Sequence, residues 1–325
     1  MKKILFSILL CSSAFISSGC KDENFNPKGE FKEKYILTCI LRSDTTVQTA
    51  VLSTSYNIQG YDPLENKTDP ALDNADIRIW VGDSVYIMKS GQIPRADSSR
   101  YSTPVKYFYV ENVKLPSNRQ AEILAVLPNG RKLHATTQIP KPVLPDYTAE
   151  EQEIPPAGRN YVIAGWQRAL NPNTFYYPRF SLIYFRLENG VPVRYLRKLP
   201  VRYFNSGGKF VPVYATPTNT ASYLIDMDAI NRTMRDISEG DMNKQNYVVL
   251  TVMAEIMTMD DNLSAYYSSL KLADNGFSVK LDQTDFTNIE GGLGVFGSFA
   301  NTKIVILMDP AYIKSFGYKS KLGPE

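Results

Sequence analysis

Side chains able to catalyse hydrolysis or to hold a metal are scarce in this 325-residue chain. The single histidine, His134, lies in an alternating stretch, residues 133–137, and is expected to be an ordinary side chain on a strand. One histidine gives almost no material for a zinc site or a histidine-based triad. Three carboxylate pairs remain, and each is more simply a turn or a helix cap: Asp73 with Asp76, Asp260 with Asp261, and Asp282 with Asp285.

We therefore expect no catalytic residue, no metal site and no cofactor, and we classify the chain as a non-enzyme. The alternative that stays open is a carboxylate-dependent glycosidase, which would need two acids about 5 to 10 Å apart in a cleft.

A glycine-rich run occupies residues 288–297, and glycines of this kind can cradle a phosphate. Gly291, Gly292 and Gly294 lack the following Lys and Ser or Thr of a P-loop, and no βαβ pattern surrounds them. We expect them to supply positive φ angles or close chain approach. The apolar residues between and after them, Leu293, Val295 and Phe296, are expected to fill a core.

The first residues have the pattern of a signal peptide, which we place at residues 1–19. Lys2 and Lys3 precede an apolar run at residues 4–16, shorter than the roughly 20 residues of a spanning helix. Small residues then lead directly to Cys20. The segment resembles the lipobox of bacterial lipoproteins, although Ser17 stands where the usual lipobox carries Leu. The resemblance implies acylation of Cys20 by fatty acids such as palmitate, which would anchor the chain in a membrane.

The residues after Cys20 are Lys21, Asp22 and Glu23. This order resembles the surface-export signal of Bacteroidetes lipoproteins, which implies a place on the outer face of the outer membrane. We place a lipidated linker at residues 20–30, and the alternative to an export signal is that Lys21, Asp22 and Glu23 are only a solvated, charged part of this linker. Of the other cysteines, Cys11 would leave with the signal peptide, and Cys39 is expected to be a buried free thiol in an apolar strand.

The charge balance argues against a nucleic-acid partner. The chain has 36 Lys and Arg against 33 Asp and Glu, a formal net charge of +3. Cleavage after residue 19 would remove Lys2 and Lys3 and no acid, leaving 34 against 33, or +1. Such a chain has no electrostatic footprint for nucleic acid.

Three prolines at Pro140, Pro142 and Pro145 mark the clearest boundary, because proline fixes its own backbone and extends its predecessor. We predict a mainly β protein: an N-terminal immunoglobulin-like β-sandwich at residues 31–139, a Pro-rich linker at 140–158, and a larger β-rich domain with two packed helices at 159–318. The sandwich is expected to contain seven strands, at residues 35–41, 46–53, 77–81, 84–88, 107–110, 120–126 and 133–138.

Turn and helix signals give this plan its detail. Hairpin turns are predicted at residues 82–83, 129–130 and 188–190. The second domain is expected to have strands at residues 161–166, 180–187, 193–201, 210–214, 221–225, 247–254 and 303–308. One helix face is formed by Met227, Ile230, Met234 and Ile237, capped by Asp226 or Asp228. A second is formed by Leu263, Tyr266, Tyr267 and Leu270 behind the capping pair Asp261 and Asn262.

Aromatic and arginine side chains crowd residues 166–204. Exposed tyrosines beside arginines favour a recognition surface, because they give large contact area at low entropic cost. The residues that we propose for such ligand binding are Trp166, Tyr176, Tyr177, Arg179, Tyr195 and Arg197. The alternative is ordinary cross-strand aromatic pairing with solvated arginines.

Taken with the lipobox, the strand domain and the Pro140 linker, the run Asn-Ile-Glu-Gly-Gly-Leu-Gly-Val-Phe-Gly at residues 288–297 is similar to the Bacteroidetes outer-membrane lipoprotein family known as domain of unknown function 4249. The resemblance covers nearly all of the chain after Cys20. It implies a lipid-anchored outer-membrane protein that faces the cell surface. It also implies association with a TonB-dependent transporter, and it brings no catalytic residues.

The expected function is therefore that of a non-catalytic accessory in nutrient capture. The alternative is an adhesin or a structural surface protein.

Overall fold

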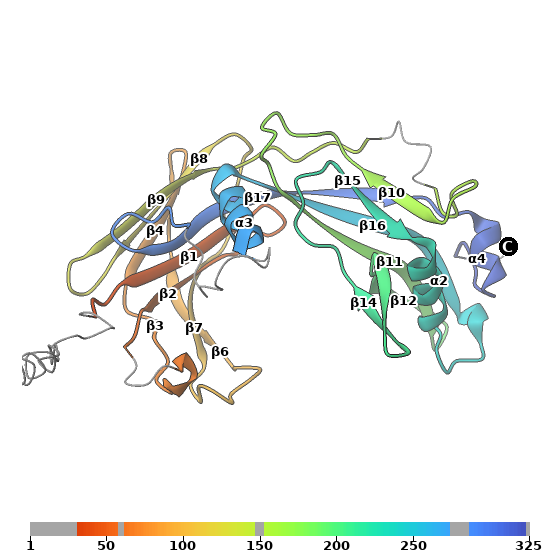
Figure 1. Ribbon diagram of the computed structural model, residues 1–325, viewed down its shortest axis with the longest axis horizontal. Helices are drawn as coiled ribbons and strands as arrows, with labels where there is room; N and C mark the ends of the chain where they lie inside the picture. Colours follow the sequence, from red (N-terminus) through yellow and green to blue (C-terminus); the bar gives the residue numbers. More distant parts are fainter. Residues whose placement is uncertain (1–30, 58–61, 147–152, 274–285, 323–325) are drawn as a thin grey trace, which may run out of the picture. The chain divides into compact units, whose positions relative to one another are not determined.

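The computed structural model of the chain describes residues 31–57, 62–146, 153–273 and 286–322 (Figure 1). The predicted signal peptide, Cys20 and the export signal at residues 21–23 lie outside the described residues, as do Asp282 and Asp285. The chain divides into two compact units, residues 1–33 and residues 34–325. The second unit contains all of the described strands and helices, and its fold is mainly β as predicted.

The first core lies between two sheets. The first of them is part of a nine-stranded sheet, and the strands that border this core are β1 (Tyr35–Arg42), β2 (Gln48–Thr54), β3 (Ala71–Leu72), β6 (Lys89–Ile93) and β7 (Val105–Val110). A short 3-10 helix, η2 (Pro63–Glu65), lies between β2 and β3 in the sequence. The other sheet contains β4 (Asp76–Val81), β5 (Ser84–Ile87), β8 (Gln120–Val126) and β9 (Lys132–Gln138) in the order β5-β4-β8-β9.

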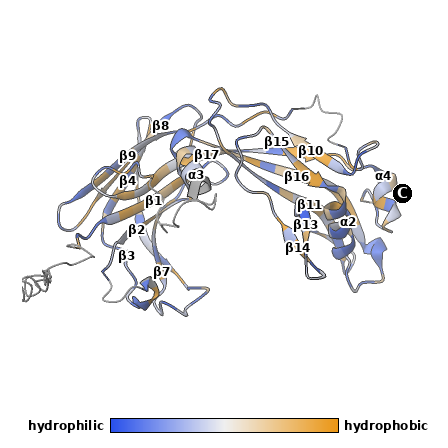
Figure 2. Cartoon of the chain, viewed as in Figure 1, coloured by the Kyte–Doolittle hydropathy of each residue, from blue (hydrophilic) through white to orange (hydrophobic). Residues whose placement is uncertain are grey.

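Alternation explains this packing. In β1 every second residue is buried, including Leu37, Cys39 and Leu41, and these side chains meet Ile79 and Ile123 of the other sheet. Cys39 is a buried free cysteine, as predicted, and burial raises the pKa of its thiol to about 12. Figure 2 shows the apolar residues gathered along the strands, as expected for sheets that bury one face. The immunoglobulin-like assignment of this sandwich remains a prediction.

One long strand, β17 (Leu293–Ile306), enters both halves of the protein. Leu293 to Phe299 pair in parallel with β1, and Phe299 to Ile306 pair in antiparallel with β16 (Tyr247–Met259). Phe296 and Ile289 accordingly belong to the first core. This corrects the expectation that residues 31–139 build the first sandwich alone and that residues 159–318 belong to the second domain.

The glycine run makes the parallel pairing possible. Gly294 has φ +117°, and a Cβ at this position would collide with the carbonyl oxygen of Leu37. Gly291 has φ +81°, and a Cβ there would strike the carbonyl oxygen of Lys132. A Cβ on Gly292 would come within 2.6 Å of the carbonyl oxygen of Tyr35. The predicted role of these glycines, positive φ and close chain approach, is confirmed.

The second core lies on one face of the strands β12 (Val191–Lys198), β11 (Tyr176–Glu188), β16 and β17, paired in that order. Two small sheets and a helix contribute to its surroundings. These are β10 (Tyr161–Gly165) with β15 (Ser222–Asp226), β13 (Arg202–Ser206) with β14 (Lys209–Val213), and α2 (Met227–Asp236). The buried side chains include Val162, Leu182, Ile225, Ile230 and Ile256.

The helices differ from prediction in detail. α2 forms as predicted, with Ile230 and Met234 buried, but its N-cap Asp226 makes no side-chain capping bond. α3 (Asp261–Ala273) is capped by Asp260, whose carboxylate accepts from the Leu263 amide at 2.8 Å, rather than by the predicted pair one residue later. A third helix, α4 (Pro310–Ser315), and a 3-10 turn, η4 (Lys244–Asn246), were not predicted.

The three predicted hairpin turns are confirmed by the pairing of Val81 with Ser84, Val126 with Lys132 and Glu188 with Val191. β3, β6 and β13 were not predicted. Parts of the predicted linker are packed against strands: Val143 is buried and its carbonyl accepts from the Thr302 hydroxyl, while the amide of buried Ile154 donates to Leu307.

Candidate functional site

The two largest aromatic side chains of the predicted recognition surface are in the core. Trp166 is 2% exposed and Tyr176 is 0% exposed, and their rings meet edge to face at 5.4 Å. The Tyr176 hydroxyl accepts a hydrogen bond from the Ala169 amide. The prediction that these two residues form an exposed binding surface is wrong, because both project into the second core.

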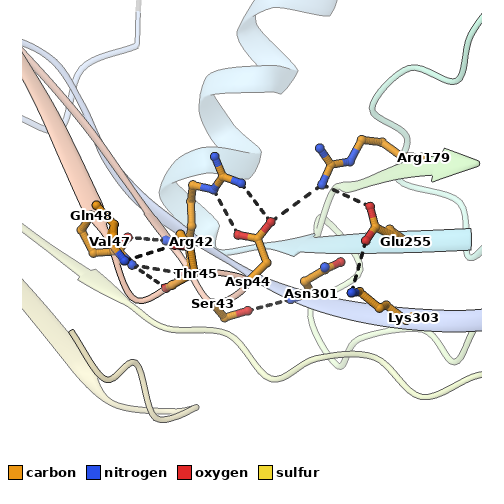
Figure 3. Close-up of polar contacts among 10 residues, drawn as sticks. All are labelled: Arg42, Ser43, Asp44, Thr45, Val47, Gln48, Arg179, Glu255, Asn301 and Lys303. Atoms are coloured by element: carbon orange, nitrogen blue, oxygen red, sulfur yellow. Dashed lines mark hydrogen bonds and ion pairs between the residues drawn. The ribbon is translucent and has the colours of Figure 1, made fainter. Parts of the chain in front are cut away.

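Tyr177 and Arg179 lie on the opposite face of β11 from this core. Tyr177 packs against a small cluster that contains Met257 and Leu263. Arg179 is 3.5 Å from the Glu255 carboxylate and 3.9 Å from that of Asp44, as Figure 3 shows. The Arg179 guanidinium is therefore committed to an ion-pair network.

Asp44 is the centre of that network. The Arg42 guanidinium donates two hydrogen bonds of 3.0 Å to its carboxylate and holds the pKa of Asp44 below its usual range. The network continues to Lys303, which is 3.7 Å from Glu255 (Figure 3). These ion pairs tie the β1–β2 turn to β11, β16 and β17, so they have a structural role.

Tyr195 and Arg197 lie on β12. The Tyr195 ring stacks on Tyr184 at 5.5 Å, and its hydroxyl donates to the Glu188 carboxylate. Arg197 is exposed. The six predicted residues thus do not form one site, and the alternative of ordinary cross-strand pairing describes Tyr195.

A groove of about 830 Å³ was not predicted from the sequence. Most of its lining residues are amides, hydroxyls, charged groups or small apolar groups. They come from the start of β8, the end of β9, the proline segment, the loop after β10 and the junction of β16 with α3. Those used below are Gln120, Thr137, Lys141, Gln167, Arg168, Asn171, Thr258, Asp260 and Asp261. Its volume falls within the range of small-molecule sites, roughly 300–1,000 Å³.

The end of β16 positions two of these side chains. Thr258 and Asp260 are two residues apart in extended chain, so they project to the same side. That side also carries Ile256 and Ala254, which belong to the second core. The groove therefore begins at the end of β16, directly after the residues of this strand that are buried in the second core.

Asp260 is a buried carboxylate without a cationic partner among the described residues. It is 5% exposed, and it accepts hydrogen bonds from the Thr137 hydroxyl and from the Leu263 amide at 2.8 Å. The Ser298 hydroxyl lies 3.4 Å from the same carboxylate oxygen as Thr137. Burial raises the pKa of Asp260 to about 7, although these hydrogen bonds favour the ionised form. The neutral form of Asp260 is therefore favoured relative to that of an exposed carboxylic acid.

Several polar groups of the lining are not used by the protein itself. The Thr258 side chain is 2% exposed, and within the described residues its hydroxyl has no hydrogen-bond partner. The side chains of Gln120 and Gln167 likewise make no hydrogen bond to the described part of the chain, and Lys141 and Arg168 have no carboxylate within 4.0 Å there. A buried unpaired hydroxyl is costly, and at the wall of a groove a bound molecule could supply its missing partner.

The groove has hydrogen-bond donors, acceptors and cations, and both of its acids already accept hydrogen bonds from groups of the protein. Asp261 accepts from the Asn171 amide group at 2.6 Å, as Asp260 does from its own partners. No group of three or more His, Cys, Asp or Glu in the described ranges could hold a metal ion. The arrangement is suited to binding a polar molecule.

His134 lies on β9 as predicted, and its ring nitrogens are 3.1 Å from Glu122 and 3.2 Å from Glu290. Of the other predicted carboxylate pair, Asp73 pairs with Lys106 at 3.1 Å and Asp76 with Arg78 at 2.7 Å. All these groups are in ion pairs or hydrogen bonds that stabilise the first sandwich.

The signal for the groove was weak in the sequence. The order Thr258-Met259-Asp260 shows that two polar side chains share one side of an extended segment, but nothing local shows that Thr137 and Ser298 close over them. Asp260 was recognised only as a turn or cap residue.

Fold and site together define a mainly β protein with two cores, one shared strand and a polar groove. The chain belongs to the family described as Domain of unknown function (DUF4249), whose model matches residues 22–304. The matched range includes the whole first core, most of the second core and every residue of the groove. None of the curated proteins compared with the chain matches it. Among the described residues no helix has the length and hydropathy to cross a bilayer.

Proposed function

We propose that this chain is a non-catalytic lipoprotein of the outer membrane that binds a polar nutrient molecule in the groove and assists a TonB-dependent transporter. The observation that carries the proposal is the unpartnered hydroxyl of buried Thr258, beside Asp260, in a groove lined by unused amides and cations. A ligand supplying an acceptor or donor to Thr258 would remove the cost of that unpaired group.

The chemistry of the groove defines the ligand class. Lys141, Arg168, Gln120 and Gln167 supply donors, and the glutamine oxygens supply acceptors. We therefore propose a small solute rich in hydrogen-bonding oxygen atoms. Asp260 can offer either an acceptor or a proton, because its pKa of about 7 leaves both forms populated at neutral pH.

The location rests on the N-terminal sequence. Residues 1–19 have the pattern of a signal peptide, and Cys20 would carry the acyl chains, palmitate among them. Lys21, Asp22 and Glu23 support export to the cell surface. The immunoglobulin-like topology of the first sandwich is part of the same proposal.

Affinity purification of the native protein from detergent-solubilised membranes tests the partner. A TonB-dependent transporter should be recovered with the wild-type chain, and its absence under conditions that preserve other membrane complexes would contradict the transporter role.

A Thr258→Val strain separates nutrient capture from attachment. Valine has nearly the shape of threonine and removes only the hydroxyl, so the protein should remain folded while growth on a limiting nutrient falls. If deletion of the gene impairs surface attachment and leaves uptake unchanged, the adhesin alternative is supported instead.

A further inference from the structure

Residues 189–225 contain no Asp or Glu, so every charged side chain in this stretch is positive. The same stretch has five cations, Arg194, Arg197, Lys198, Arg202 and Lys209. All five are exposed. The stretch includes β12 and the β13–β14 hairpin.

These five cations differ from three arginines of the same half that are in ion pairs. Arg179, Arg186 and Arg232 each lie within 4.0 Å of a carboxylate, from Glu255, Asp241 and Asp228 respectively. Across the described ranges none of the five cations of residues 189–225 has such a partner. Their charges are therefore not balanced by a carboxylate of the described chain.

The two faces of the β13–β14 hairpin have different surroundings. Tyr203 and Phe210 belong to one face, and the Arg232 guanidinium of α2 lies over both rings, at 5.3 and 3.9 Å from their centroids. These cation–π contacts attach the hairpin to α2.

The other face is exposed and mixed in character. Phe204 and Val211 are cross-strand partners and are 62% and 47% exposed. Arg202 lies two residues before Phe204, and Lys209 lies two residues before Val211, so both cations share this face. We call these four residues the hairpin face. The turn between the strands is closed by Gly207 and Gly208, both at positive φ, and the Gly208 amide donates to the Asn205 side chain at 3.0 Å.

We propose that the hairpin face docks on a membrane surface that carries anionic headgroups. One aromatic and one branched apolar side chain, with a cation at each end, match the boundary between acyl chains and phosphates. The hairpin is a separate sheet of two strands with five paired positions, and its face offers four residues where a stable protein interface uses about 20–30 on each side. A lipid surface needs no shape complementarity and accepts so small a face.

The docking does not depend on the groove or on the acylation of Cys20, so it is tested with a chain that cannot be acylated. Protein that begins at residue 20, with Cys20→Ser and without the predicted signal peptide, is mixed with vesicles of phosphatidylglycerol and phosphatidylcholine, or of phosphatidylcholine alone, and sedimented. The chain should bind the anionic vesicles at least tenfold more tightly, and the difference should shrink at high salt. Equal binding to both vesicles would overturn the proposal.

Two variants locate the contact. Phe204→Ser with Val211→Ser, and Arg202→Gln with Lys209→Gln, should each weaken binding about tenfold. The matched control is Val85→Ser with Ile87→Ser, because these side chains of β5 are 51% and 60% exposed and lie far along the sequence in the first sandwich. Thermal unfolding of each variant establishes that it is folded.

The remaining outcomes are also decisive. If the hairpin variants bind as the control does, the hairpin face is not the contact and the proposal fails. If the chain binds a soluble acidic polypeptide such as polyglutamate but neither kind of vesicle, the occupant is an acidic protein and the membrane proposal fails. Loss of binding in the hairpin variants alone supports it, whatever the result for Thr258→Val.

Discussion

Asp44 and Asp260 are both carboxylates at places where distant strands meet, but their surroundings make them opposites. The Asp44 side chain is 16% exposed and is bound by the Arg42 guanidinium, so its ionised form is favoured. Asp260 is more deeply buried and has no cationic partner among the described residues, so burial raises its pKa although hydroxyl and amide groups donate hydrogen bonds to it.

The contrast separates a structural acid from one that can respond to a ligand. The charge of Asp44 is balanced within the protein by Arg42 and Arg179. Asp260 lies beside the unpartnered Thr258 hydroxyl and the unpaired cations of the groove. Its carboxylate can therefore gain a partner that the chain itself does not supply.

The largest effect should be a pH dependence that Asp260→Asn removes. The folded pKa of about 7 lies above the ordinary value of 3.8, so the stability contributed by the neutral acid is fully present below about pH 4. It is lost as the pH rises through 7, and the full change is on the order of 4 kcal/mol at 1.36 kcal/mol per pKa unit.

Urea unfolding at pH 5 and pH 8 measures the part of this change that falls above pH 5, on the order of 2–3 kcal/mol. The free energy of unfolding should fall between the two pH values in the wild type and change less in Asp260→Asn. Parallel curves for the two proteins would show that Asp260 ionises as an exposed acid does.

Thr137→Val should lower the free energy of unfolding by about 1–3 kcal/mol at pH 8, because the ionised Asp260 loses a buried donor. At pH 5 the loss should be smaller, since a neutral acid depends less on that donor. Chemical denaturation at both pH values checks this, with Thr136→Val, on the neighbouring and less buried position, as the control.

Asp44→Asn should cost about 0.5–1 kcal/mol at neutral pH, the usual worth of a partly exposed ion pair. The pKa of Asp44 is depressed, so this contribution is present above the unfolded value and is lost as the pH falls through the folded one. The difference from the wild type should therefore vanish in acid and shrink in high salt, opposite to the behaviour of Asp260. A loss that persists at low pH would contradict the ion-pair account.

The smallest stability effect is expected for Thr258→Val. Removing a buried hydroxyl that has no partner in the described chain should leave the free energy of unfolding unchanged or raise it by about 1 kcal/mol. A loss above this size, measured by urea unfolding without ligand, would mean that the hydroxyl already has a structural partner. The residue would then lose its place in the proposed site.

Local patterns predicted much of the fold. Strand alternation in β1, the turn signals at Gly82 and Gly130, and the apolar stripe of α2 all depend on neighbouring residues, and all are confirmed. Of β17, only the end was predicted, as a strand at residues 303–308, and it was placed in the second domain. The rest was missed because it pairs in parallel with β1, which lies more than 250 positions away in the sequence.

The candidate site was mostly beyond local patterns. The sequence shows that residues 166–204 are rich in aromatics, but it does not show that Trp166 and Tyr176 project into the core while Phe204 projects out. Asp260 looks like a helix cap, which it is, and only the approach of Thr137 and Ser298 makes it buried.

The central claim, that the groove binds a polar molecule, is tested most directly by native mass spectrometry of the protein purified from its own membranes. The wild-type chain should carry a small-molecule adduct that is lost on mild activation, and Thr258→Val should carry at least tenfold less of it while remaining folded. Equal adduct on both proteins, or none on the wild type, would contradict the account.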